Sequence, residues 1–240
     1  MATKEQEAEP RGGERSRKRD PAAVRADILA VAAKEFADHG LSGGRVDEIA
    51  ARTRTSKRMI YYYFGDKDAL YRRVLEEAYR RVRVEEEALD LDGLSPIDAL
   101  VALAGFTFDH HRRNKDFIRL VMIENIHRGE FLRQSDTITA LNQPAIDRAS
   151  ALLDRGMADG LFRPNITPLT LHWLISALAT FNVSNQQTFS CLFGSELWSE
   201  AGQIRLGTEC GAIVLRYVLS DDALAARKAP SACDDGSATA

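Results

Sequence analysis

The hydrophobic positions of this chain repeat with a helical period from residue 21 onward. Asp20 is a good N-cap, and Pro21 follows it at the first helical position. The apolar stripe of this first helix consists of Val24, Ile28, Ala32 and Phe36. Gly40 ends the helix, and no segment of the chain alternates polar and apolar residues as a strand does. The pattern therefore predicts an all-α fold.

Two short helices follow in close succession. Val46, Ile49, Ala50 and Thr53 have the i, i+3, i+4, i+7 spacing of an amphipathic helix. Only two residues then precede Ser56, an N-cap for the next helix, which Gly65 ends. Helices joined by so tight a turn are typical of a helix-turn-helix, whose second helix enters the major groove of DNA.

The second short helix has two chemically different faces. At 100° per residue, Ile60, Tyr63 and Phe64 share one side, within reach of Met59. The other side carries two cations and two phenols, Lys57, Arg58, Tyr61 and Tyr62. Such a helix can bury its apolar side and present phosphate-binding and base-reading groups to a duplex.

The segment SKRMIYYYFGDKDALY resembles the signature of the TetR family, and VDEIA is similar to the family's first helix-turn-helix helix. The resemblance covers residues 21–72. It implies a transcriptional regulator, most often a repressor, that binds a pseudo-palindromic operator on double-stranded DNA as a homodimer and is released by a small-molecule effector. The DNA-binding residues that it implies, together with the helix face above, are Arg45, Arg54, Thr55, Ser56, Lys57, Arg58, Tyr61, Tyr62 and Lys67.

Two residues depart from the family pattern. Arg54 stands where the turn usually has glycine, so a left-handed conformation there costs roughly 1 kcal/mol unless the arginine contacts DNA or the turn differs. Gly44 and Arg45 stand where a serine or threonine usually opens the first helix of the motif. We therefore expect a weaker cap and an Arg45 that seeks a phosphate.

The remainder of the chain also shows helical patterns. A long helix from Lys67 to Leu89 places Leu70, Val74, Ala78 and Val82 inward, and its arginines, Arg83 among them, are expected on the outer face. Further helices are expected at 97–111, 115–127, 137–160, 169–184 and 196–219, with Pro144 as a kink or a helix start.

These patterns predict a three-helix DNA-binding domain at 21–66 followed by a larger helical bundle at 67–220 for ligand binding and dimerisation. Residues 1–20 form a disordered basic tail, either an arm that reaches DNA or a solubilising extension, and residues 221–240 form a second disordered tail.

The last two long helices are apolar nearly all round, so both of their sides need covering. A twofold partner is one cover, and a deep core within one protomer is the alternative. The residues expected at a dimer interface are Leu174, Leu178, Phe181, Ile213 and Tyr217.

Large or polar residues within apolar helices are candidates for an effector pocket. They are Phe106, Phe108, His110, His111, Met122, Asn125, Trp173 and Asn182. The alternative is that they are ordinary core aromatics and surface polar groups. The presence of some pocket is implied by the family resemblance.

Two other functions compete with a ligand-responsive repressor. Glu124-x-x-His127, near His110-His111, resembles half of a di-iron site, but no second copy of the motif occurs, so we expect no metal, no cofactor and no enzyme. The other is a ligand-independent DNA-binding protein or an activator.

Composition supports a DNA-binding protein with a localised positive surface. The chain has 240 residues, 45% hydrophobic and 28% charged, with a net charge of −3. Residues 45–64 nevertheless carry five Lys or Arg against two acids, Asp47 and Glu48. Without a bilayer-length apolar run or a signal-peptide core, we expect a cytoplasmic protein with no membrane partner.

Overall fold

The computed structural model describes residues 20–228, and the expected basic tail at residues 1–19 lies outside that range. The α-helices are α1 (Pro21–Gly43), α2 (Val46–Arg52), α3 (Lys57–Phe64), α4 (Lys67–Glu87), α5 (Pro96–Arg113), α6 (Lys115–Ile126), α7 (Asp136–Ala158), α8 (Pro168–Ser184), α9 (Gln186–Phe193), α10 (Glu200–Val218) and α11 (Asp221–Lys228). Two 3₁₀ turns, η1 (Leu132–Gln134) and η2 (Glu196–Trp198), complete them. Within residues 20–228 the β-structure consists of one isolated antiparallel bridge, between Phe162 and Leu219. The all-α prediction is confirmed.

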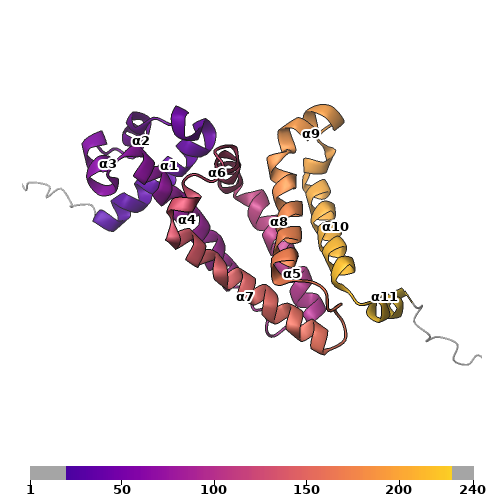
Figure 1. Cartoon of the computed structure of the whole chain (residues 1–240). Coiled ribbons are helices and arrows are strands. Elements are labelled where there is room, and N and C mark those ends of the chain that lie inside the picture. The colour runs from indigo at the N-terminus through magenta and orange to yellow at the C-terminus, as the bar shows by residue number, and fades with distance from the viewer. Residues whose placement is uncertain (1–19, 229–240) are drawn as a thin grey trace, which may run out of the picture.

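Helices α1–α3 form one end of the molecule and α8–α10 the other, with the long helices α4 and α7 running between them (Figure 1). The helix starts follow from local sequence. The side chains of Asp20, Ser56 and Asp66 accept hydrogen bonds from backbone N–H groups two or three residues later, which caps α1, α3 and α4. The starts of these three helices are therefore stabilised by hydrogen bonds within their own segments.

The core of the DNA-binding end is centred on Tyr71 of α4. The Tyr71 ring packs edge-on against Phe36 of α1 at 5.3 Å and against Phe131 at 5.1 Å between ring centroids. Ile28, Ile49 and Ile60 fill the remaining space. Because Phe131, together with Leu120 of α6 and Ile138 of α7, belongs to this core, the packing extends past residue 66, where the sequence suggested a domain boundary.

The larger bundle surrounds α5, which packs against α7, α8 and α10. Its core is built from Leu100, Leu153, Leu171, Ile175, Val214 and their neighbours. Phe162 is accommodated because residue 156 is glycine: a Cβ at Gly156 would lie 2.0 Å from the Phe162 ring. None of the helices within residues 20–228 has the length and apolarity needed to cross a membrane.

Of the two alternatives at Pro144, a new helix start is wrong. Helix α7 runs through Pro144, and Pro144 and Ala140, whose carbonyl loses its helical partner, are both exposed to water. Two further expectations about the helices were wrong. The stretch before Gly194 is helix α9. The predicted disorder from Asp221 onward does not hold for Asp221–Lys228, because Leu224 packs against the bundle core; residues 229–240 lie outside the described range.

The outward placement of Arg83 was also wrong. Arg83 is 9% exposed and Glu86 is 7% exposed, because both lie with Tyr79 and Val82 on the inner stripe of α4. Positions 79, 82, 83 and 86 follow the i, i+3, i+4, i+7 rule, so the stripe was visible in the spacing although two of its members are charged.

Candidate DNA-binding face and effector cavity

The turn between α2 and α3 is a Schellman motif with an arginine at its left-handed position. Arg54 has φ +51°, its N–H donates to the carbonyl of Ala51, and the N–H of Thr55 donates to the carbonyl of Ala50. The Thr53 hydroxyl donates to the carbonyl of Ile49 at 2.8 Å and is buried. The usual turn is thus formed without the usual glycine, and Arg54 carries the conformational cost.

Helix α3 separates its two faces as the sequence predicted. Ile60 is fully buried, whereas the Tyr62 side chain is 77% exposed. Lys57 and Arg58 are exposed, and the Lys57 ammonium pairs with the Asp47 carboxylate of α2 at 3.1 Å. This face therefore presents the Lys57 and Arg58 cations and the exposed phenol of Tyr62 to an approaching duplex. Lys57 is paired with the exposed Asp47.

The remaining predicted DNA-binding residues surround α3. Arg45 is exposed, forms no side-chain cap for α2, and pairs with Glu48, while its backbone N–H donates to the buried Glu35 carboxylate. Lys67 is half-buried at the start of α4 and donates to the carbonyl of Ser42. The other members of the predicted set, Arg54, Thr55, Ser56 and Tyr61, are exposed or half-buried around the turn and on α3.

Replacing Arg54 by glycine will separate stability from DNA binding. Glycine removes the left-handed penalty, so the free energy of unfolding should rise by about 0.5–1 kcal/mol, while operator binding weakens because a cation is lost. The matched control is Arg128→Gly: Arg128 has φ +59° at the equivalent position after α6, far along the chain from the helix-turn-helix. Urea denaturation and a DNA titration of both variants test this. Equal DNA affinity in the two variants would remove Arg54 from the interface.

A cavity of about 480 Å³ lies inside the bundle, bounded by α4, α5, α6, α7 and α8. Its apolar wall includes Phe106, Phe117, Val121, Ile138, Ile146 and Leu169. Its polar wall includes Arg83, Glu86, His110, His111, Asn142, His172, Ser176 and Thr180. The size and the mixture of a large apolar wall with a few polar groups are typical of small-molecule sites.

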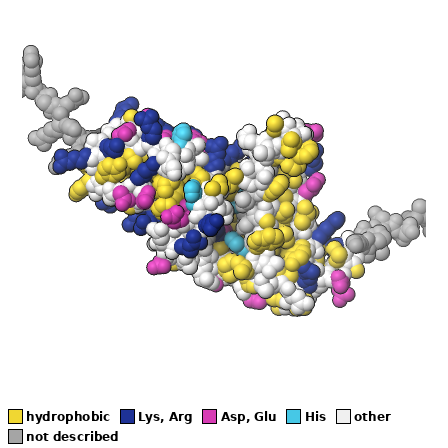
Figure 2. All heavy atoms as spheres, turned by 45° about the horizontal axis from the view of Figure 1, so that its top comes forward, with side chains coloured by type: hydrophobic (Ala, Val, Ile, Leu, Met, Phe, Trp, Pro, Cys, Tyr) yellow, Lys and Arg dark blue, Asp and Glu magenta, His cyan; other side chains and the backbone are white. Residues whose placement is uncertain are grey.

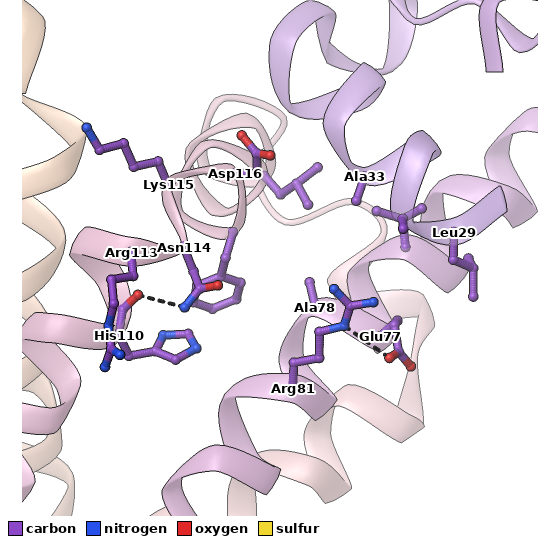
Figure 3. Close-up of a pocket in the computed structure, with 14 residues that line it drawn as sticks. Leu29, Ala33, Glu77, Ala78, Arg81, His110, Arg113, Asn114, Lys115 and Asp116 are labelled. Atoms are coloured by element: carbon purple, nitrogen blue, oxygen red, sulfur yellow. Dashed lines mark hydrogen bonds and ion pairs between the residues drawn. The ribbon is translucent and has the colours of Figure 1, made fainter. Parts of the chain in front are cut away.

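A second hollow of about 320 Å³ adjoins the first and reaches the DNA-binding end. Figure 3 shows Leu29 and Ala33 of α1 and Ala78 of α4 facing His110 across this crevice. His110 and Phe117 line both hollows, so these two rings form a shared wall. The side chains of His110 and Phe117 therefore lie between the inner cavity and the crevice beside α1.

The structure brings three of the candidate ligand residues, Phe106, His110 and His111, to the inner cavity. Phe108 packs instead in a separate cluster with Ala179 and Cys210. Trp173 is 66% exposed, because the inward positions of α8 are His172 and Ser176, and Trp173 lies about 100° round the helix from His172. Asn125 is exposed and bonds to the carbonyl of Val121, and Met122 is outside the lining.

Asn182 has a structural partner instead. It forms a reciprocal amide pair with Gln203 of α10 at 2.8 and 3.1 Å, and its carbonyl accepts from the Trp198 indole. This buried pair ties α8 to α10. Asn182 lines a smaller hollow beside Trp198 and Gln203 and is absent from the lining of the central cavity.

Sequence analysis missed Arg83, Asn142 and His172 as cavity residues. Arg83 had a detectable signal, since it falls on the apolar stripe of α4. His172 had a weaker one, as a polar residue inside an apolar helix. Their convergence depends on how α4, α5 and α8 are rotated about their axes, which the local pattern does not fix.

The surroundings of the imidazoles in the cavity lower their pKa values and so favour the neutral form. Burial is the largest cause for His111, followed by repulsion between its charged form and those of His110 and Arg83, and together they lower the pKa of His111 to about 3. Burial also lowers the pKa of His110, opposed by Glu85, and the pKa of His172. The charged groups that line the cavity are thus Arg83 and Glu86, which pair with each other.

Large apolar side chains remain exposed on the two helices expected at a dimer interface. Those of α8 and α10 are Leu169, Trp173, Phe181, Ile204, Ile213 and Tyr217. Leu174 and Leu178 are half-buried and pack against cores of their own protomer. Figure 2 shows hydrophobic side chains gathered over the end of the molecule that holds α8–α10. Such a patch is unusual on a monomer and typical of an interface.

Glu124 has a structural position that its sequence motif did not suggest. It is 1% exposed, and its Oε2 atom accepts hydrogen bonds from the backbone N–H groups of Phe131 and Leu132, both at 3.1 Å. His127, its partner in the presumed motif, is exposed. The carboxylate therefore holds the loop between α6 and α7 and does not face His127 across a metal site.

Comparisons with known proteins agree with this geometry. Residues 28–74 match the model of bacterial regulatory proteins of the tetR family, and residues 96–214 match a tetracyclin repressor-like C-terminal domain. The chain is 35% identical to the HTH-type transcriptional repressor NicS of Pseudomonas putida over 72% of its own length and 82% of the relative's. It is 32% identical to the HTH-type transcriptional repressor SCO4008 of Streptomyces coelicolor over 73% and 86% of the two chains.

Solved structures share the fold. The transcriptional regulator SCO4942 of Streptomyces coelicolor superposes with a TM-score of 0.63 at 28% identity, covering 81% of this chain and 98% of that one. The regulator FadR of Bacillus subtilis, solved with stearoyl-CoA, has a TM-score of 0.61 at 16% identity, covering 79% and 97%. The relatives are named as regulators of transcription and not as enzymes. This chain belongs to the TetR family of bacterial transcriptional regulators.

Proposed function

We propose that this regulator is a cytoplasmic repressor that binds a pseudo-palindromic operator as a homodimer and dissociates when a small molecule fills the cavity bounded by α4–α8. The observation that carries the proposal is the double role of α4. Its first turns supply Leu70, Tyr71 and Val74 to the core beneath α3, and its later turns supply Tyr79, Val82 and Arg83 to the cavity wall. One rigid helix thus touches both the ligand site and the DNA-binding end.

Two copies are favoured by the exposed apolar surface of α8 and α10 and by the small size of α3. Eight residues of recognition helix reach only a few base pairs, so one copy gives little specificity. A twofold pair that covers Phe181, Ile213 and Tyr217 places two such helices on one duplex. The operator is then a pseudo-palindrome whose half-sites match the separation of the two helices.

The release mechanism is a shift between two spacings of the recognition helices. An effector that fits the cavity better in the spacing that mismatches the operator lowers DNA affinity by its difference in binding free energy between the two states, about 1–3 kcal/mol. The crevice between α1 and α4, separated from the cavity by His110 and Phe117, gives α4 room to tilt against the DNA-binding end.

The proposal predicts a steep salt dependence on the protein's own operator. The operator is first selected from a random duplex pool, and a recovered sequence with twofold symmetry is the expected result. With roughly 6–8 phosphate contacts per dimer, log K against log salt should fall with a slope of about −5 to −7. A slope near −3, or a selected site without symmetry, would contradict binding as a dimer.

Release by an effector is tested by adding compounds to the protein–operator complex. A compound that raises the melting temperature of the free protein should also lower its operator affinity, because it stabilises the state that mismatches DNA. Compounds that bind the cavity and leave operator affinity unchanged would identify a ligand-independent DNA-binding protein instead.

A further inference from the structure

One wall of the inner cavity contains a buried guanidinium whose hydrogen-bonding capacity is only partly used. Arg83 donates from Nη1 to the Glu86 carboxylate, and its Nε–H is buried without any partner. The residue is more than nine-tenths buried and lines the cavity. A guanidinium has five donors in a planar fork, so the edge formed by Nε and Nη2 remains available for a planar acceptor.

The imidazoles of His110 and His111 also line the cavity. The Nδ1 atoms of His110 and His111 are buried without hydrogen-bond partners, and both residues are more than nine-tenths buried. The charged groups around the imidazoles are Arg83, Glu85 and Glu86 of α4 and Arg113 of α5, with the third imidazole of His172 on α8.

Apolar surface directly adjoins these polar groups. Phe106 and Phe117 lie within about one ring width of His110, at 5.7 and 6.1 Å between ring centroids, and Tyr79 packs edge-on against Phe117 at 5.2 Å. Branched aliphatic side chains of α6 and α7 extend this surface. The cavity therefore combines the Arg83 guanidinium with a larger apolar lining.

From this arrangement we infer that the effector is a small organic acid, whose carboxylate binds the donors of the Arg83 guanidinium that Glu86 leaves unused, with its hydrocarbon body against Phe106 and Phe117. The inference rests on the proposed function, since it names the class of molecule that fills the proposed effector site. An acid of about ten non-hydrogen atoms fits easily in 480 Å³.

The wall discriminates between classes of ligand by charge. A cation would be repelled by Arg83, and the carboxylate that could attract it, Glu86, is already paired with the guanidinium. A neutral amide matches the shape of an acid but gains only ordinary hydrogen bonds, whereas a carboxylate gains charge-assisted ones that are roughly twice as strong. The anion leaves the Glu86 pair intact because that pair uses the Nη1 edge.

The test compares acids with their own primary amides on the full-length protein. Benzoate is paired with benzamide and octanoate with octanamide, extended to aromatic and aliphatic acids of about six to twelve carbons, and binding is measured by thermal shift and calorimetry. We expect at least one acid to bind at least tenfold more tightly than its amide. If amides bind as well as acids, or if no acid raises the melting temperature, the inference is overturned.

Variants at the guanidinium locate the binding site. Arg83→Lys keeps the charge but removes the Nε edge and should weaken the bound acid by about tenfold, while its amide is unaffected. Since Arg83→Met would leave Glu86 buried and unpaired, the double variant Arg83→Met, Glu86→Met keeps the cavity neutral and should abolish the preference for acids. Arg80→Met, on an exposed turn of the same helix, is the matched control.

The failure of this inference is distinguishable from the failure of the proposed function. Operator binding by the protein without any compound is measured in parallel. If neutral compounds dissociate the operator complex and acids do not, the inference of an acidic effector is overturned. The proposed function as an effector-responsive repressor would still hold. Unchanged acid preference in the Arg83 variants would place the acid elsewhere in the molecule and would also overturn the inference.

Discussion

Replacing Lys57 by alanine will weaken operator binding by about 30-fold without lowering the melting temperature. The exposed Lys57 side chain stands on the open face of α3, and its partner in the free protein, Asp47, is itself exposed. A surface ion pair of this kind contributes at most about 1 kcal/mol to folding. On the proposed two-half-site operator, the loss of roughly 1 kcal/mol in each half-site doubles in the proposed dimer, and about 2 kcal/mol is close to 30-fold.

The measurement is a titration of labelled operator with wild type, Lys57→Ala and a remote control, Arg205→Ala, which removes an exposed cation from α10. Tyr62→Phe, which removes one hydroxyl from a 77% exposed side chain, should weaken binding less than Lys57→Ala. The salt slope of Lys57→Ala should be shallower by about 2, one phosphate contact in each half-site. Equal affinity of Lys57→Ala and Arg205→Ala would mean that α3 presents a different face to DNA.

Replacing Glu124 by alanine will destabilise the fold by about 2–4 kcal/mol. The substitution leaves the backbone N–H groups of Phe131 and Leu132 without an acceptor, and an unsatisfied buried donor costs about 1–3 kcal/mol. Phe131 also packs on Tyr71, so the loosened loop reaches the core of the DNA-binding end. The carboxylate contributes more through the loop that it holds than through any charge it carries.

Denaturation in urea measures this effect, with Glu130→Ala as the control because Glu130 is an exposed acid in the same loop. Glu124→Gln retains one acceptor oxygen and should fall between wild type and Glu124→Ala. A loss below about 1 kcal/mol in Glu124→Ala would show that water replaces the carboxylate at both N–H groups.

The helix-turn-helix could be predicted because its signals are local. The caps at Ser56 and Asp66 act within three residues, and the division of α3 into a buried Ile60 side and an exposed Tyr62 side follows from the helical period alone. Even the cost at Arg54 was visible, since the position requires a positive φ whatever the rest of the chain does. No distant contact has to be known for any of these inferences.

The cavity could not be predicted in the same way. Its residues come from five helices, and a rotation of any one of them by 100° exchanges a lining residue for its neighbour, as happened with Trp173 and His172 on α8. The charged pair Arg83 and Glu86 lies inside because the two residues neutralise each other there, whereas each taken singly is expected at the surface. The burial of such an ion pair cannot be predicted until the positions of both side chains are known.

The sequence by itself determined the all-α class, the helix boundaries around the DNA-binding motif and the chemistry of its exposed face, because helix period and end-capping act over three to seven residues. Only the tertiary structure decided that Glu124 holds a loop, that Asn182 joins α8 to α10, and that Arg83, His110 and His111 converge on one cavity. Those outcomes depend on the relative rotation of helices packed around α5, which is set by the fit of the whole core.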